Sequence, residues 1–219
     1  MSTEKLGGTQ RIFSGAIWNG LSQVIIQGST ILTTILVARE LGPGPYGLVG
    51  MAAIFTALLA FFIEFGLLSS YILTDKPTKV DEGSIFTTSL ILSATLYGLS
   101  FYLAPYVSAF YGENITEIIR VLFLQFLFVP FGIIPEASER KSMEFKKISI
   151  SLSAATIISS ALAITLAYLG AGAWSLVAQP IALISIKNTS LALQTKKYPQ
   201  LYFTIKTAKR HLKTGWQFT

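Results

Sequence analysis

The chain has 219 residues, of which 52% are hydrophobic and only 13% are charged, and its mean hydropathy is +0.58. A soluble domain carries about a quarter charged residues, so this composition excludes an ordinary soluble protein. The net charge of +6 does not indicate nucleic acid, because the basic residues lie between apolar runs rather than on one stripe. The chain has no cysteine, which excludes disulfides, thiol catalysis and thiolate metal sites.

The first two predicted helices are separated by a tight turn. Residues 12–38 carry no charge, and a bilayer core about 30 Å thick needs about 20 apolar residues as helix. This run is also too long for the apolar part of a signal peptide, so we expect a retained membrane helix. Residues 39–47, dense in Gly and Pro, predict the turn. Residues 48–74 predict the second helix, which contains one acid, Glu64.

A charged loop over residues 75–82 precedes the third predicted helix. That helix lies within the charge-free window 83–112, and we expect it to end near Pro105. Residues 114–117 have the pattern of a helix start, with a capping residue and an acid three positions later.

The fourth predicted helix, residues 118–135, should be kinked by Pro130. Residues 136–147 predict a charged loop. The window 148–186 is uncharged for 39 residues, which is too many for one crossing. A break at residues 170–172, Gly-Ala-Gly, divides it into a fifth and a sixth helix.

The sixth helix should reach about Gln194. The basic tail, residues 196–219, predicts either a helix lying on an anionic inner leaflet or a charge that only fixes topology. The expected domains are a cytoplasmic N-terminus (1–11), a six-helix transmembrane lobe (12–194) and a basic cytoplasmic linker (195–219).

Orientation follows from the Lys and Arg residues of the short loops. With the N-terminus in the cytoplasm, only Arg39 and Arg120 lie on the outer side, and Lys187 lies within the membrane. The other 14 of the 17 basic residues lie inside. A missed crossing would scramble this ratio, so we expect six crossings with both ends inside.

A polar row on the first helix is the clearest candidate for a functional surface. Its members step by three or four residues and fall within an arc of about 80°: Asn19, Gln23, Gln27, Thr30 and Thr34. Amides facing lipid are costly, so the row should face protein or water. Two hypotheses stay open, a hydrophilic cavity lined by the row and helix packing through hydrogen bonds.

Two charges lie deep in the membrane. Glu64 lies about 24 Å along the second helix by helix rise, and Lys187 lies at nearly the same depth in the sixth. They either pair or both face a wet cavity, although Lys187 has the alternative of reaching the inner surface.

Small residues on one face of the fifth helix predict close helix packing: Ser149, Ser153, Thr156, Ser160 and Ala163. No enzyme signal is found. His211 is the only histidine, so a zinc site is not expected, and no P-loop is present. The sequence predicts no cofactor, metal site or catalytic residue.

The residues of several connections resemble those of one known family. Residues 35–47 resemble the turn "LAR-x-LGP-x-x-YG" of Wzx-type polysaccharide biosynthesis proteins, the flippases of lipid-linked oligosaccharides. Residues 62–67, 109–112 and 135–147, the last with Arg140, Phe145 and Lys146, are similar to further segments of that family. Residues 170–179 resemble the "G-x-G-x-W-A/S-L-V-x-Q" motif at the start of helix six in that family. The last residue of the motif is Gln179 in this chain.

The resemblance implies one lobe of a two-lobed transporter, because family members have 12 to 14 helices around a central cavity. Residues 215–219 look like the opening of a seventh helix, so we expect a truncated sequence or a single lobe. The fold class is therefore an all-α polytopic membrane protein. The candidate substrate path comprises Asn19, Gln23, Gln27, Thr30, Thr34, Arg39, Glu64, Arg120, Gln179 and Lys187, with interface anchoring as the alternative for Arg39 and Arg120.

The implied function is translocation of a polyprenyl-pyrophosphate-linked oligosaccharide across the bacterial inner membrane by alternating access, for surface polysaccharide. The implied partners are that lipid-linked oligosaccharide, membrane lipids, a polysaccharide polymerase and other glycan-assembly proteins. Two alternatives stay open. One is a cation-coupled exporter of small molecules that uses Glu64, and the other is a non-transporting membrane scaffold for glycan assembly.

Overall fold

The computed structural model describes residues 2–113, 115–198 and 201–202, and it describes no side chain at 2–14, 16 and 58–66. Within this part, the chain is helical and has no strand. Its helices are α1 (Ser2–Leu41), α2 (Pro43–Leu73), α3 (Lys79–Tyr111), α4 (Thr116–Leu122), α5 (Gln125–Phe128), α6 (Pro130–Lys141), α7 (Phe145–Tyr168) and α8 (Ala173–Thr195).

The membrane-spanning potential of these helices follows from length and composition. Four of them are long and apolar enough to cross a bilayer, namely α1 from Ile17, α3, α7 and α8. The bent segment formed by α4, α5 and α6 is a fifth if it is counted as one span. These findings establish a multi-pass helical membrane protein. The prediction of six crossings stays a prediction, since α2 includes side chains outside the described part.

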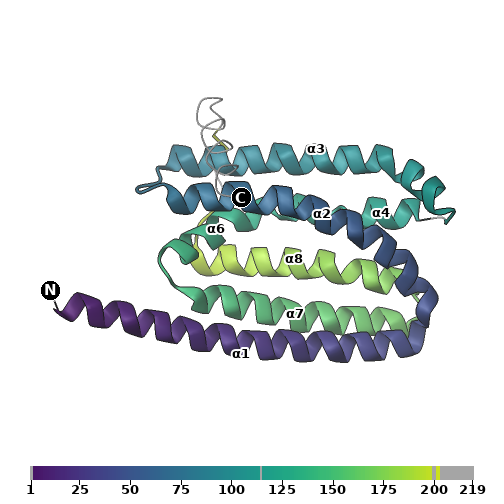
Figure 1. Ribbon diagram of the computed structural model, residues 1–219, viewed down its shortest axis with the longest axis horizontal. Coiled ribbons are helices and arrows are strands. Elements are labelled where there is room, and N and C mark those ends of the chain that lie inside the picture. Colours follow the sequence, from purple (N-terminus) through teal and green to yellow (C-terminus); the bar gives the residue numbers. More distant parts are fainter. Residues whose placement is uncertain (1, 114, 199–200, 203–219) are drawn as a thin grey trace.

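The long segments run in alternating directions, so the start of α1 and the end of α8 lie at the same end of the bundle (Figure 1). We call this the basic end, because its connections and the adjoining helix ends carry Lys76, Lys79, Lys141, Lys146 and Lys147.

The opposite end holds the α1–α2, α3–α4 and α7–α8 connections. Each of them contains glycine with positive φ, at Gly42, Gly112, Gly170 and Gly172. We call it the glycine end. Only glycine adopts this left-handed backbone region without steric cost, which explains why tight reversals gather these residues.

The turn between α1 and α2 is shorter than expected. Residues 39–47 were predicted as a turn, but α1 continues to Leu41 and α2 begins at Pro43, which leaves Gly42 alone between them (φ 70°). Proline is well suited to the first helical position, because that position needs no N–H donor and the ring already holds a helical φ.

Helix α3 also exceeds its predicted bounds. It begins at Lys79 with a capping box, in which the Thr78 hydroxyl accepts from the Asp81 amide and the Asp81 carboxylate accepts from Thr78. The expected end near Pro105 is wrong, since the helix continues to Tyr111 and ends at Gly112. A proline removes a single N–H donor, which membrane helices tolerate.

The predicted fourth helix is a broken segment. Pro130 bends it by 45°, as expected, with α4 and α5 on one side and α6 on the other. Helix α4 begins at Thr116, inside the segment 114–117 that predicted a helix start, with Ile115 as a cap that makes no side-chain bond; the expected cap Asn114 lies outside the described residues.

The charged loop predicted over residues 136–147 is wrong. Helix α6 extends to Lys141, and only residues 142–144 connect it to α7. The ion pair between Glu136 and Arg140, four residues apart, supports a helix through this charged stretch.

The predicted break between the last two helices is confirmed. Helix α7 ends at Tyr168, and α8 runs from Ala173 to Thr195. The basic tail lies outside the described residues except for 196–198 and 201–202, so its expected helix remains a prediction.

Helix α3 turns hydroxyls toward the inside of the bundle and hydrocarbon side chains outward. The buried face of α3 includes Ser89, Ser93 and Ser100, whereas Ile91 and Leu99 of the same helix are about half exposed. A soluble bundle has the reverse pattern, because water drives apolar side chains inward. In lipid no such force acts between helices, and small side chains allow close packing. This arrangement therefore agrees with a membrane environment.

Two kinds of contact hold the helices together. An apolar core of buried residues lies among α2 to α6 and α8, with Leu67, Ile85, Phe126 and Val177 among its members. Helix α1 instead packs on α7, which in turn packs on α8 (Figure 1). The core therefore leaves α1 as a flank of the bundle.

Candidate functional site

Helix α1 meets α7 through hydroxyls. The Ser22 and Ser153 hydroxyl oxygens are 2.9 Å apart, and the Ser149 hydroxyl donates to the Asn19 side-chain oxygen at 3.1 Å. Every member of the small-residue row on α7 is buried, from Ser149 to Ala163. The predicted close packing of this face is thus confirmed.

Only the first member of the predicted polar row on α1, Asn19, contacts α7. All five members are exposed: Asn19, Gln23, Gln27, Thr30 and Thr34. The face that packs on α7 contains Ser22 and lies about 100° around the helix from Gln23. Helix packing through hydrogen bonds therefore accounts for Asn19 alone, and the rest of the row stands open on the flank.

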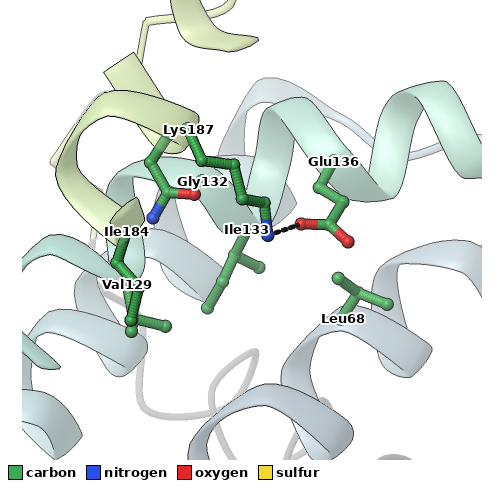
Figure 2. A pocket seen from close by; sticks show the side chains of 8 residues that line it. Leu68, Val129, Gly132, Ile133, Glu136, Ile184 and Lys187 are labelled. Carbon is green, nitrogen blue, oxygen red and sulfur yellow. Dashed lines mark ion pairs between the residues drawn. The ribbon is translucent and has the colours of Figure 1, made fainter. Parts of the chain in front are cut away.

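A buried ion pair joins α8 to α6. The Lys187 ammonium lies 2.8 Å from Oε2 of Glu136, and the two side chains are 21% and 11% exposed (Figure 2). The other carboxylate oxygen, Oε1, accepts from Nη2 and Nε of Arg140 at 2.6 and 3.0 Å. One carboxylate thus holds two cations, which leaves a local excess of positive charge.

Glu136 is not among the predicted site residues, because the charged stretch that contains it indicated a loop. Pairing of Lys187 with Glu64 was one of the alternatives for these two charges, and it stays untested because the Glu64 side chain lies outside the described residues. The bonding partner that the structure supplies to Lys187 is Glu136. An acid four residues before Arg140 was the available signal, since that spacing is typical of a helix.

Asn188 repairs the helix break beside this ion pair. Its side-chain amide donates to the carbonyl oxygen of Phe128 at 2.8 Å. The Gly132 N–H, which would reach Phe128 in a regular helix, bonds to Val129 instead. Asn188 therefore supplies a hydrogen bond to a carbonyl that the Pro130 bend leaves without its helical donor. Lipid cannot supply such a bond.

Gly132 makes room for that amide. A Cβ atom at this position would clash with the Oδ1 and Cγ atoms of Asn188. A glycine in α6 is thus required for the close approach of α8. The sequence alone offered no signal for this contact, because the two residues are 56 positions apart.

A small cavity lies beside the ion pair, between α2, α6 and α8. Its lining includes Leu68, Ile133, Glu136, Lys187 and Asn188 (Figure 2). The volume is about 40 Å³, and a single water needs about 10–15 Å³ measured in this way. The cavity therefore has room for a few waters but not for a sugar.

The other candidates are dispersed. Arg39 is exposed at the glycine end. Arg120 pairs with Glu117 at 2.8 Å and lies over the Phe101 ring at 4.1 Å, contacts that favour an anchoring role. Gln179 is half-buried in α8. Among the described side chains, the structure does not gather the predicted path residues into one site.

A second polar cluster closes the basic end. Glu82 of α3 accepts from the Tyr71 hydroxyl at 2.7 Å and from Lys197 at 3.2 Å. Lys141 donates to the backbone carbonyls of Thr74 and Asp75. These bonds tie the α2–α3 connection to the ends of α6 and α8.

Comparisons with known proteins assign the chain to one family. A family model described as "Polysaccharide biosynthesis protein" matches residues 36–219. The chain is 23% identical over 189 residues to the succinoglycan biosynthesis transport protein ExoT of Rhizobium meliloti (strain 1021), over 86% of this chain and 38% of that protein. It is also 23% identical over 142 residues to the lipopolysaccharide biosynthesis protein WzxC of Escherichia coli (strain K12), over 64% of this chain and 29% of that protein. No solved structure matches significantly. The chain thus spans less than two fifths of either relative.

Proposed function

We propose a transport function for this chain, which belongs to the polysaccharide biosynthesis protein family, since the family model covers most of its length. The proposed cargo is an oligosaccharide linked to a polyprenyl pyrophosphate, moved across the bacterial inner membrane toward the cell surface. The printed names of both relatives support a role in polysaccharide export or assembly. A transport role also agrees with the absence of enzyme motifs in the sequence.

The exposed polar row on α1 carries this proposal. From Asn19 to Thr34 the row extends over about 22 Å by helix rise, which is most of the hydrocarbon thickness. Amides left against acyl chains would have no hydrogen-bond partner, and each such group costs several kcal/mol. The flank therefore faces a wet path or another protein surface, and sugar hydroxyls are suitable partners for its amides.

The small cavity at Lys187 has a different role in this proposal. It is too small for a sugar, so the glycan is assigned to the α1 flank and the ion pair to support of the bend in α6. The lipid tail of the cargo stays in the bilayer, where the exposed apolar side chains of the bundle already lie.

A second lobe completes the path. The α1 flank is open in this chain, and a two-lobed transporter would enclose it between similar halves. Transport then proceeds by alternating access, as one lobe rocks against the other. The gathering of lysines at the basic end supports a cytoplasmic N-terminus through the positive-inside rule.

A complementation experiment tests the proposal. A strain that lacks the gene should accumulate lipid-linked oligosaccharide on the cytoplasmic leaflet, and the full-length gene should restore export. The double variant Gln23→Leu with Gln27→Leu should fail to restore it at an unchanged level of membrane protein. The matched control, Val24→Leu with Ile31→Leu, alters exposed apolar residues of the same helix and should restore export fully.

Three outcomes contradict the proposal. Export restored by the Gln23 and Gln27 variant would exclude the α1 flank. Loss of small-molecule efflux without a glycan defect would indicate the cation-coupled exporter. Normal flipping in the deletion strain, together with dispersed glycan-assembly enzymes, would indicate the scaffold.

A further inference from the structure

The most exposed aromatic side chains of α3 form a stripe near its C-terminal end. Tyr102, Tyr106 and Phe110 are 76%, 74% and 84% exposed. Their spacing of four residues keeps them within an arc of about 80° on the helix. No charged residue occurs between Gly83 and Gly112. We call these three residues the aromatic stripe.

Tyr102 and Phe110, the first and last residues of the stripe, each pack against a neighbouring ring that contacts another helix. Tyr102 packs edge-on against Phe101, with centroids 6.2 Å apart, and the Arg120 guanidinium covers Phe101. Phe110 packs edge-on against Tyr111 at 5.4 Å.

The bracing of Tyr111 comes from α2, because its ring meets Phe55 at 6.3 Å. Phe101 is thus held against α4 and Tyr111 against α2, while the rings of Tyr102 and Phe110 are exposed. The first and last rings of the aromatic stripe are therefore held in place by side chains that pack against other helices.

The position of the aromatic stripe along the bundle identifies its surroundings. It lies at the end of α3 that belongs to the glycine end of the bundle (Figure 1). The exposed Tyr168, the last residue of α7, and Trp174, the second residue of α8, lie at that end as well. Toward the middle of α3, the exposed residues are aliphatic, with Ile91 and Leu99 each 51% exposed. The aromatic stripe thus continues a lipid-facing surface up to the end of the bundle.

We propose that the aromatic stripe binds the headgroup layer of the bilayer at the glycine end and sets the depth of the bundle in the membrane. A tyrosine has an apolar ring and a polar hydroxyl, and such residues are enriched at both membrane interfaces. The change from aliphatic to aromatic exposed residues along the uncharged part of α3 marks the passage from acyl chains to headgroups. This inference depends on the multi-pass membrane location and not on the proposed transport.

Tryptophan fluorescence with brominated lipids tests this depth. The full-length protein is reconstituted with Trp18, Trp174, Trp216 and any tryptophan outside these residues replaced by phenylalanine. Tyr106→Trp places one reporter in the stripe, and Ile91→Trp places a control at mid-membrane on the same helix. Bromines near the headgroups should quench Tyr106→Trp about twofold more than bromines deep in the chains, and the order should reverse for Ile91→Trp.

Two results overturn the proposal. The first is emission typical of water with no quenching at position 106, which would leave the stripe free for a protein or a glycan. The second is stronger quenching at position 106 by the deep bromines. If Tyr106→Trp does not fold, Phe110→Trp provides the same measurement, with circular dichroism as the check on helix content.

Discussion

Replacement of Gly132 by alanine should destabilise the bundle. The added Cβ would clash with the Oδ1 and Cγ atoms of Asn188, and even Nδ2 would lie only 2.8 Å away. The Asn188 side chain must then move, and its 2.8 Å bond to the Phe128 carbonyl is lost.

The magnitude follows from two costs and one gain. Overpacking of a tight helix contact costs about 1–3 kcal/mol. A hydrogen bond between membrane helices is worth about 0.6–1.7 kcal/mol. Alanine is a better helix former than glycine by about 1 kcal/mol, which offsets part of the loss. The net expectation is a loss of about 1–3 kcal/mol in the free energy of unfolding.

The assay is reversible unfolding in mixed micelles, with a matched control and a double-mutant cycle. Gly98→Ala is the control, because a Cβ atom at that position meets nothing within 4 Å, and it should be neutral or slightly stabilising. Asn188→Ala removes the group that Gly132→Ala displaces, so in that background Gly132→Ala should cost little. Equal costs of Gly132→Ala with and without Asn188 would refute the reasoning.

Three further predictions concern the ion pair, the α1–α7 contact and the polar row. Glu136→Gln should lower the free energy of unfolding by about 3 kcal/mol, because it leaves buried Lys187 unpaired. Adding Lys187→Met should recover most of this loss in the double variant. Additive costs of the two changes would exclude the ion pair. Ser153→Leu should separate α1 from α7 at Ser22 and lower the free energy of unfolding, whereas Ser153→Ala should change that free energy by less than about 1 kcal/mol. Equal effects of the two changes would argue against tight packing. Gln27→Leu should leave the free energy of unfolding unchanged within about 0.5 kcal/mol, because the side chain is exposed. A large drop in that free energy would mean that the Gln27 side chain is packed.

Much of the fold was accessible to sequence reasoning because a bilayer imposes simple rules. Long uncharged runs predicted the helices, and the Gly-Ala-Gly break between α7 and α8 was located correctly. The kink at Pro130 followed from its missing N–H. The errors fell at helix ends, where charged residues 136–141 proved helical and Pro105 did not end α3. Local composition cannot decide such ends, because neighbouring helices satisfy the groups that a local reading counts as unpaired.

The candidate site divides in the same way. A polar row on α1 was visible from spacing alone, and its orientation away from α7 was not. Lys187 was recognisable as an intramembrane charge, but Glu136 was hidden in an apparent loop. The Gly132–Asn188 contact had no signal at all, since it joins two helices that are distant in the chain.

What the amino-acid order alone determined is the class of molecule, the segments that enter the membrane and the end where lysines gather. These depend on hydrophobicity and charge, which are properties of each residue and of its immediate neighbours. What only the tertiary structure decided is which polar groups meet. Ser22 reaches Ser153, Asn188 reaches Phe128 and Lys187 reaches Glu136 because separate helices pack closely, and in lipid that packing depends on detailed shape rather than on a general burial force.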